Sequence, residues 1–283
     1  MTGAEVRKTL TELGIRPSRK LGQNFLVDTN MRDALISDAQ PQPGECILEI
    51  GAGLGAMTEK LLDAKCEVVA VEFDHRLADY LQHRFGEMPG FSLVQGDACK
   101  LDYKKLLGEI RYRCIANLPY SCGTIILAEL LKTDNPPHEL FVLLQKEMGK
   151  RLAAEPSTKA YGALTIQVRN RYKVDILRRV KPGVFFPTPE VESAYIRLKK
   201  RNDCLVAAGQ HQLFVRVVKA GFSQRRKRLY RLLENEFNHE LVKELFEELG
   251  LNQNTRAEQL GVSTFNRITA EIAKILKRNQ HKT

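Results

Sequence analysis

Four consecutive residues, Asn117-Leu118-Pro119-Tyr120, have the types and the spacing for chemistry on an amine. They come at the end of a short apolar run, which includes Cys114, Ile115 and Ala116 and predicts a strand. Such a corner brings together a side-chain amide, a main-chain carbonyl outside the sheet ladder and an aromatic face. These three groups can hold a planar base that carries an exocyclic amine.

A glycine-rich turn lies upstream of this corner. Gly51-Ala52-Gly53-Leu54-Gly55 directly follows the predicted strand 46–50. Glycines permit a tight turn and close approach of the backbone to a ligand. The start of the following helix offers unpaired N–H groups and positive partial charge. The turn also fits the loose dinucleotide pattern G-x-G-x-x-G/A. A nicotinamide oxidoreductase is therefore a remote alternative, which mixing with NADH and following its fluorescence would test.

Three carboxylates near the turn favour a different cofactor. Glu72 ends the next predicted strand, 21 residues after Gly51, where a carboxylate accepts hydrogen bonds from ribose hydroxyls. Asp97 and Ala98 follow the third strand and are placed for an adenine edge. Glu49 would sit badly beside a pyrophosphate but suits a cofactor with an amine and a sulfonium. The sequence thus favours S-adenosylmethionine as the donor of a group to an amine on a base.

Composition limits the partners and the compartment. The chain has 283 residues, 43% of them hydrophobic, which is enough for a large domain with or without a small one. Lys and Arg number 44 against 34 acidic residues, a formal net charge of +10 that suits a polyanionic partner or an acidic membrane surface. There is no run of 18 apolar residues and no apolar leader segment, so we expect a cytoplasmic protein without a membrane span. The six scattered cysteines and six histidines predict reduced thiols and no metal site.

Residues 31–200 alternate strand-like and helix-like stretches, which predicts a mostly parallel sheet with helices on both faces. The segment 181–192 is too short for a helical crossover, so we expect the last two strands to pair antiparallel at one edge. The predicted strands are 46–50, 67–72, 91–95, 113–117, 139–145, 173–180 and 193–198, and the predicted helices between the first five are 57–63, 77–85, 103–107 and 124–131.

After residue 200 the pattern becomes helical. Apolar residues recur at helical spacing in 213–220, 228–237, 240–249 and 265–276. Gly250 is expected to end a helix and Ser263 to cap the start of one. We therefore divide the chain into a domain 1–200, with an N-terminal segment 1–40 covering the cofactor, and a helical RNA-binding domain 201–283. Basic residues crowd between Phe222 and Tyr230, and the expected RNA phosphate contacts are Arg225, Arg226, Lys227 and Arg228; the alternative is a solvated helix face.

Five motifs in one order resemble the ribosomal RNA adenine dimethyltransferases of the KsgA type. The resemblance covers nearly the whole chain and extends more distantly to the Erm resistance methyltransferases and mitochondrial transcription factor B. The motifs are Arg19–Leu26, Leu48–Gly55, Asn117–Tyr120, Phe185–Ala194 and Phe222–Lys227. Ala116, residues 121–124 and Glu192 depart from the usual family pattern, which leaves the fine shape of the target pocket open.

The resemblance implies a Rossmann-like class I S-adenosylmethionine-dependent methyltransferase domain with a seven-stranded sheet and a small all-α C-terminal domain. It implies that Tyr120 and Phe185 sandwich the base. From the chemistry of the amine, we expect the Asn117 side-chain carbonyl and the Pro119 main-chain carbonyl to accept its two N–H bonds. These four are the expected catalytic residues. The expected cofactor-binding residues are Gln23, Asn24, Leu26, Glu49, Gly51, Gly53, Glu72, Asp97, Ala98 and Asn117.

The resemblance also implies a substrate. The expected reaction is dimethylation of the N6 amines of two adjacent adenines near the 3′ end of 16S rRNA, within the small ribosomal subunit, by a monomeric protein with a role in subunit biogenesis. One alternative is an Erm-type enzyme that acts on 23S rRNA, although the helical tail and Leu118 favour the first reading. Another is a small-subunit assembly factor, or a transcription cofactor, in which catalysis is secondary.

Overall fold

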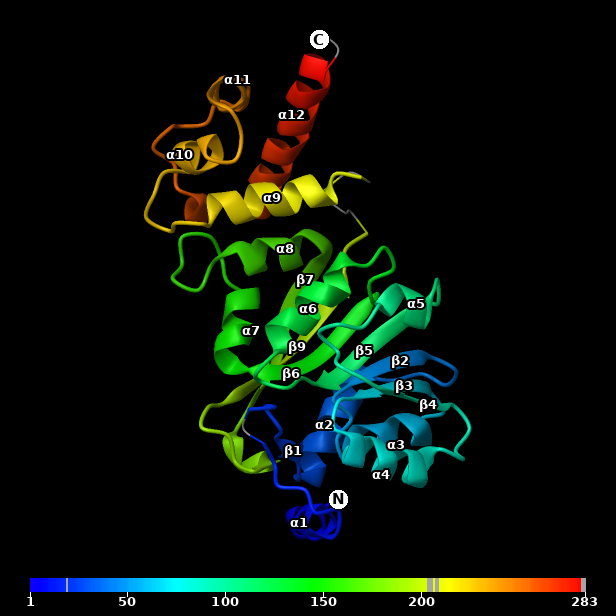
Figure 1. Ribbon diagram of the computed structural model, residues 1–283. Helices are drawn as coiled ribbons and strands as arrows, with labels where there is room; N and C mark the ends of the chain where they lie inside the picture. The colour runs from blue at the N-terminus through cyan, green and yellow to red at the C-terminus, as the bar shows by residue number, and fades with distance from the viewer. Residues whose placement is uncertain (19, 203–205, 207–208, 281–283) are drawn as a thin grey trace. The chain divides into compact units, whose positions relative to one another are not determined.

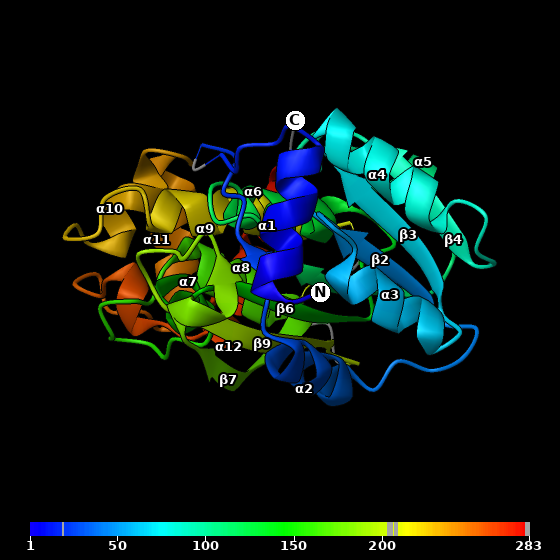
Figure 2. The same cartoon turned by 90° about the horizontal axis from the view of Figure 1, so that it is seen from below.

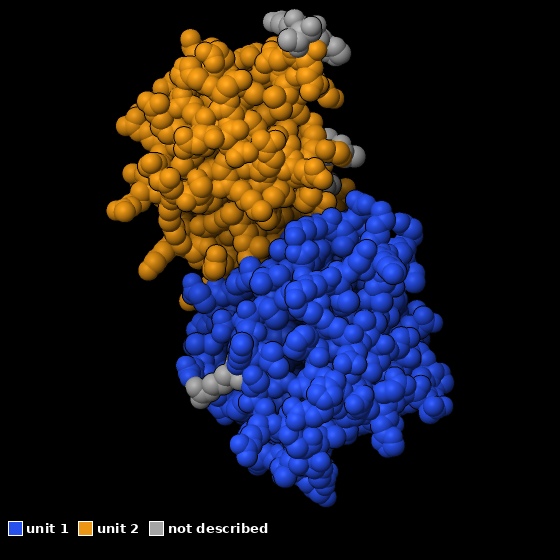
Figure 3. Space-filling model, in the orientation of Figure 1, with its two compact units in different colours: residues 1–149, 174–200 blue, residues 150–173, 201–283 orange. Residues whose placement is uncertain are grey.

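The computed structural model describes residues 1–18, 20–202, 206 and 209–280; Arg19, the first residue of the N-terminal motif, lies outside them. The chain forms two compact units, coloured separately in Figure 3. We call Met1–Gly149 with Val174–Lys200 the sheet unit, and Lys150–Lys173 with Arg201–Thr283 the helical unit. The helical unit therefore contains a segment that the predicted boundary at residue 200 assigned to the first domain.

A seven-stranded sheet forms the centre of the sheet unit, in the order β4-β3-β2-β5-β6-β9-β7 (Figure 1). Each pair of neighbours from β4 to β6 is parallel, whereas β9 is antiparallel to β6. The last two strands lie together at one edge, as predicted. The bounds are β2 (Cys46–Ile50), β3 (Glu67–Glu72), β4 (Phe91–Gln95), β5 (Tyr112–Asn117), β6 (Glu139–Gln145), β7 (Tyr172–Val180) and β9 (Ser193–Lys200).

The central strands are apolar because the parallel sheet is covered on both faces. In β2 and β5, Ile47, Leu48 and Ile115 have no exposed surface. The connecting helices supply the cover; Leu61, Leu81 and Phe85 from two of them pack into the same core. These connections are α3 (Ala56–Asp63), α4 (His75–Phe85), α5 (Tyr103–Leu107) and α6 (Gly123–Lys132).

Short elements before the sheet were not predicted. They are α1 (Gly3–Glu12), β1 (Phe25–Leu26) and α2 (Thr29–Ala39). Figure 2 shows the two helices from below. Strand β1 pairs antiparallel with β8 (Phe185–Phe186), which follows a 3₁₀ turn (Pro182–Val184). This ladder joins the N-terminal motif to the late motif. Two residues are too few for any periodicity to reveal a strand.

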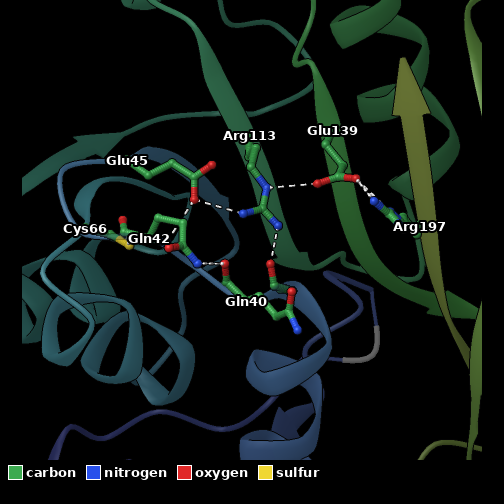
Figure 4. A network of polar contacts seen from close by, with 8 residues as sticks. Gln40, Gln42, Glu45, Cys66, Arg113, Glu139 and Arg197 are labelled. Carbon is green, nitrogen blue, oxygen red and sulfur yellow. Dashed lines mark hydrogen bonds and ion pairs between the residues drawn. The ribbon is translucent and has the colours of Figure 1, made fainter. Parts of the chain in front are cut away.

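A charged network closes the amino-terminal edge of the sheet (Figure 4). Arg113, at the start of β5 and only 4% exposed, donates to Glu45 Oε2 at 2.8 Å and to the Ala39 carbonyl. Its Nε forms an ion pair with Glu139 Oε2 at 3.3 Å, and Glu139 also accepts from Arg197 at 2.6 Å. Each buried charge thus has an opposite partner, which offsets the cost of removing it from water.

The helical unit has a core of its own. Phe214, Leu229 and Phe265 are fully buried there, and Tyr161 and Ile166 from the segment 150–173 belong to the same core. That packing places the segment in this unit. Its helices are α8 (Ala163–Arg171), α9 (His211–Gly221), α10 (Leu229–Glu234), α11 (His239–Leu249) and α12 (Val262–Gln280), with a 3₁₀ turn at Ala257–Gln259; α7 (Lys146–Leu152) and β7 carry the chain between the units.

Two predicted helix boundaries in this unit have different outcomes. Gly250 ends α11 with a left-handed φ of 60°, as predicted. The prediction for Ser263 is wrong because α12 begins at Val262, which places this serine inside the helix.

Candidate active site

The carboxyl ends of β2, β3 and β5 open into a cavity of about 310 Å³ in the sheet unit. Parallel strands bring these ends to the same edge, where ligands of such sheets bind. The residues that line the cavity include all ten predicted cofactor-binding residues: Gln23, Asn24, Leu26, Glu49, Gly51, Gly53, Glu72, Asp97, Ala98 and Asn117. Pro119 and Tyr120 also line it, whereas Phe185 does not.

Glu72 supports the glycine-rich turn. Gly51 and Gly53 adopt left-handed φ angles of 72° and 60°, which glycine adopts without strain. Glu72 Oε2 accepts the Gly53 N–H at 2.8 Å, and Oε1 accepts the N–H groups of Phe73 at 2.9 Å and Asp74 at 3.0 Å. Burial raises the pKa of Glu72, although these N–H bonds oppose the rise. A carboxylate has about four acceptor positions, so one stays open to a ligand hydroxyl.

Glu49 lines the cavity and is almost completely buried, with 2% of its surface exposed. Burial raises the pKa of Glu49 to about 8, against the hydrogen bond that Thr58 Oγ1 donates to it at 2.7 Å. The carboxyl is therefore mostly protonated at pH 7 when no cation is near. The sequence predicted the position of this acid but not its protonation state, which depends on burial.

Several cavity residues were missed by sequence reasoning. Phe73 is 56% exposed although it is a large aromatic residue, and it lies between Glu72 and Asp74 at the cavity. Its position directly after the acidic strand end was the available signal. Cys99 and Cys122 also line the cavity, and burial and the neighbouring Cys122 raise the pKa of Cys99 to about 12.

The Asn117 side chain has a fixed orientation. Its Nδ2 donates to the Asn24 carbonyl at 2.9 Å, while no donor contacts its Oδ1 within the part of the chain that the structure describes. The N-terminal segment packs closely here, because a Cβ at Gly22 would lie 2.9 Å from the Tyr120 nitrogen. The amide therefore presents its oxygen as a free acceptor, with its NH₂ group already bound.

The carbonyl of Pro119 does not have the free lone pair that its predicted role requires. It accepts the N–H of Cys122 at 3.2 Å and the N–H of Gly123 at 2.9 Å, at the start of α6. A carbonyl oxygen has two lone pairs, so both are used. The Leu118 carbonyl accepts no such backbone bond among the described residues, and Leu118 lines the cavity next to Asn117. The geometry therefore favours Leu118 as the second amine acceptor.

The two predicted stacking rings do not form a slot for a base. The ring centroids of Tyr120 and Phe185 are 6.4 Å apart, and their planes meet at 77°. A base between two parallel rings needs contacts of about 3.5 Å on each side, so its partners must be parallel and about 7 Å apart. Phe185 is only 2% exposed and packs in the core. Of these two rings, Tyr120 is thus the one that lines the cavity, with Phe185 beside it at a steep angle.

A model of the family described as ribosomal RNA adenine dimethylase matches residues 15–274. The chain belongs to the ribosomal RNA adenine dimethylase family. It is 36% identical over 268 residues to the ribosomal RNA small subunit methyltransferase A of Clostridium acetobutylicum, covering 94% of this chain and 97% of that protein. Its identity to the protein of the same name in Alkaliphilus oremlandii is 35% over 266 residues, covering 92% and 93%.

Two solved structures resemble this adenine dimethylase in fold. A dimethyladenosine transferase from Plasmodium falciparum superposes with a TM-score of 0.76 at 22% identity, covering 88% of this chain and 98% of that chain. The 23S rRNA methyltransferase ErmE superposes with a TM-score of 0.66 at 21% identity, covering 88% and 100%. These likenesses confirm the Rossmann-like methyltransferase fold that the motifs predicted.

The four basic residues predicted to bind RNA in this dimethylase have different environments. Arg225 donates to Glu258 at 2.7 Å and to the carbonyls of Lys159 and Thr158 at 2.6 and 3.0 Å. Arg226, Lys227 and Arg228 are exposed and have no such partners among the described residues. All four precede α10, in a turn and not on a helix face. Arg225 therefore holds this part of the helical unit together.

Two features of this dimethylase were compared with what a membrane span and a metal site require: the length and polarity of its helices, and the grouping of its His, Cys, Asp and Glu side chains. Across residues 1–18, 20–202, 206 and 209–280, no helix has the length and apolar character needed to span a membrane. In the same residues, no group of three or more His, Cys, Asp and Glu side chains could hold a metal ion.

Proposed function

We propose that this protein transfers methyl groups from S-adenosylmethionine to the N6 amines of two adjacent adenines near the 3′ end of small-subunit ribosomal RNA. The observation that carries the proposal is the Asn117 amide, which Asn24 orients at the end of an acid-lined cavity. Membership of the adenine dimethylase family and relatives named for the small subunit support the reaction and the substrate. Within this proposal the protein acts as a monomer in the cytoplasm.

The cavity residues fit S-adenosylmethionine. Glu72 keeps an acceptor position for ribose hydroxyls, and the left-handed turn at Gly51 and Gly53 lets the backbone approach a ligand. The buried carboxyl of Glu49 would gain from a positive charge nearby. Asp97 lines the cavity and would accept from the adenine amine of the cofactor. When bound, S-adenosylmethionine would supply a methyl group on a sulfonium, and S-adenosylhomocysteine would leave as a neutral thioether.

The residues of the corner then prepare the target amine. Its nitrogen is a poor nucleophile because the lone pair delocalises into the ring. Asn117 Oδ1 and the Leu118 carbonyl would accept its two N–H bonds, which favours a pyramidal nitrogen with a localised lone pair. Tyr120 would stack on the base and hold it outside the RNA helix. Alignment supplies most of the rate in this scheme. After the transfer the positively charged nitrogen would lose one of its protons to water, so no general base is required.

The ionisation of Glu49 predicts a pH-dependent affinity for S-adenosylmethionine. The empty site holds a proton below about pH 8, and a bound cation favours loss of that proton. Affinity should therefore rise from pH 5.5 to 7.5, by at most about tenfold per pH unit, because one pKa unit is a tenfold change in an equilibrium. Calorimetry in two buffers of different ionisation enthalpy should count the proton released.

Glu49→Gln is the control for this effect. It keeps a hydrogen-bond acceptor for Thr58 but cannot ionise, so its affinity should change little between pH 5.5 and 7.5. The difference between wild type and this variant removes any titration of the cofactor itself. Equal pH profiles for the two proteins would contradict a titrating Glu49.

Incorporation of labelled methyl groups into undermethylated ribosomal subunits tests the function directly. We expect dimethyladenosine confined to the small subunit, with its position given by mass spectrometry of the RNA. Label in the large subunit would instead place the activity with the Erm-type enzymes. Tight binding to the small subunit without any label would favour an assembly factor.

Arg226 and Lys227 should bind RNA phosphates. The double variant Arg226→Gln/Lys227→Gln should weaken binding to small-subunit RNA, because each basic side chain that binds a phosphate releases a counterion. The slope of log affinity against log salt should fall by about 1 for each phosphate that is no longer neutralised. Filter binding between 50 and 300 mM salt would measure the slope.

Two variants make this test specific. Lys243→Gln/Lys277→Gln removes the same charge from α11 and α12 of the helical unit and should leave the slope nearly unchanged.

Arg225→Gln should lower the melting temperature because the Arg225 side chain donates hydrogen bonds to Glu258 and to two backbone carbonyls. Equal slopes in wild type and Arg226→Gln/Lys227→Gln would refute the RNA contact.

A further inference from the structure

The hydroxyl groups of Tyr120 and Ser193 are in hydrogen-bond contact, although 73 positions separate the two residues. Ser193 is fully buried at the start of β9. Burial raises the pKa of Tyr120, so the phenol stays protonated at neutral pH and can donate to Ser193. The contact ties the Tyr120 ring, which lines the cavity, to the sheet.

Ser193 lies in a rigid part of the sheet unit. It pairs with Gln145 in the antiparallel ladder of β6 and β9, and the Lys146 N–H donates to the Glu192 carbonyl at 2.9 Å. The Glu192 carboxylate accepts from Arg179 at 2.7 and 2.6 Å and from Lys146 at 2.6 Å. The ladder and this cluster of charges thus hold the backbone on both sides of the serine hydroxyl.

Tyr120, by contrast, lies in the turn between β5 and α6, where no ladder restrains it. Two contacts of its side chain bear on the plane of the ring: the edge contact with Phe185 at 6.4 Å and the hydroxyl contact with Ser193. An edge contact alone allows the ring to tilt. The hydroxyl contact fixes the far end of the ring and therefore its orientation toward the cavity.

We propose that Ser193 is a positioning residue, whose hydroxyl holds the Tyr120 ring in the orientation that stacks on the target adenine. The inference rests on the proposed function and adds a residue that does not itself touch substrate or cofactor. It assigns the phenol oxygen of Tyr120 an anchoring role and no role in proton transfer. Loss of either hydroxyl should have the same effect, because each removes the same bond.

A double-mutant cycle tests this coupling. Ser193→Ala and Tyr120→Phe should each lower kcat by about tenfold, and the double variant should be no slower than either one. The affinity for S-adenosylmethionine should stay at the wild-type value in all three. Ser92→Ala removes a serine hydroxyl from the exposed face of β4 and should have wild-type kcat. Wild-type kcat in Ser193→Ala, or losses that multiply in the double variant, would overturn the inference.

A second measurement does not depend on activity. Tyrosine ring resonances in protein labelled at the ring carbons can be assigned to Tyr120 with Tyr120→Phe. Ser193→Ala should shift the Tyr120 resonance and speed its ring flips, while Ser92→Ala should not. An unchanged resonance would refute the anchor whatever the activity. A shifted resonance in a protein whose wild type transfers no methyl to any RNA would instead refute the proposed function.

Discussion

Asn117→Ala should lower kcat for methyl transfer by about 10²- to 10³-fold, which is the usual cost of removing one polar group that acts in the transition state. The variant loses the Oδ1 that would hold the target amine pyramidal. It also loses the bond to the Asn24 carbonyl, which contributes to the closure of the N-terminal segment over the cavity. Since the glycine turn and the acids remain, affinity for S-adenosylmethionine should fall by less than about tenfold.

Single-turnover assays with saturating cofactor would separate these two effects, and calorimetry would give the cofactor affinity. Asn202→Ala changes an asparagine outside the cavity and is the matched control, with wild-type turnover expected. Near-wild-type turnover in Asn117→Ala would show that another group activates the amine. If cofactor affinity fell by as large a factor as turnover, the main role of Asn117 would be to bind S-adenosylmethionine and not to activate the amine.

Glu72→Ala should weaken S-adenosylmethionine binding by at least about a hundredfold, because hydrogen bonds to a charged group count for more than neutral ones. The carboxylate accepts three backbone N–H groups, from Gly53, Phe73 and Asp74. Removing it leaves these donors without their partner and frees the glycine turn at the same time as it removes the acceptor for ribose. The melting temperature should therefore fall even without cofactor.

Glu67→Ala is the control for this prediction, because Glu67 begins the same strand, is exposed and does not line the cavity. Its cofactor affinity should equal that of wild type. A Glu72→Ala protein that melts early but binds S-adenosylmethionine normally would show that Glu72 only braces the turn. The opposite result, weak binding with normal melting, would assign it to the ligand alone.

The sheet was predictable because each of its strands depends on the residue pattern of one short segment. Short, mostly apolar runs between turn residues predict strands, and β2, β3, β4 and β6 have the predicted bounds. Parallel strands also bring distant residues to one edge, so Glu72, Asp97 and Asn117 could be placed at a common cavity from their positions after strands.

Other features depend on contacts that no local pattern reports. Whether Pro119 can accept a bond depends on α6, whose first N–H groups take both of its lone pairs. The edge contact of Tyr120 with Phe185 joins residues 65 positions apart, and Phe185 itself pairs with Leu26 in the ladder of β1 and β8. Arg225 appears as one of several basic residues in the sequence, yet Glu258 and the segment 150–173 determine its role.

Strand β5 carries the Arg113 network at its start and Asn117 at its end, four residues and about 13 Å apart. The start of the strand stabilises the fold through ion pairs, and its end carries the amide proposed to hold the target amine. Substitutions among Glu45, Arg113 and Glu139 can therefore change the stability to heat without altering the amine site. Substitutions around Asn117 can change the substrate without breaking the charged network at the other end of the strand. Thermal adaptation and substrate choice can thus evolve along separate routes in one short strand.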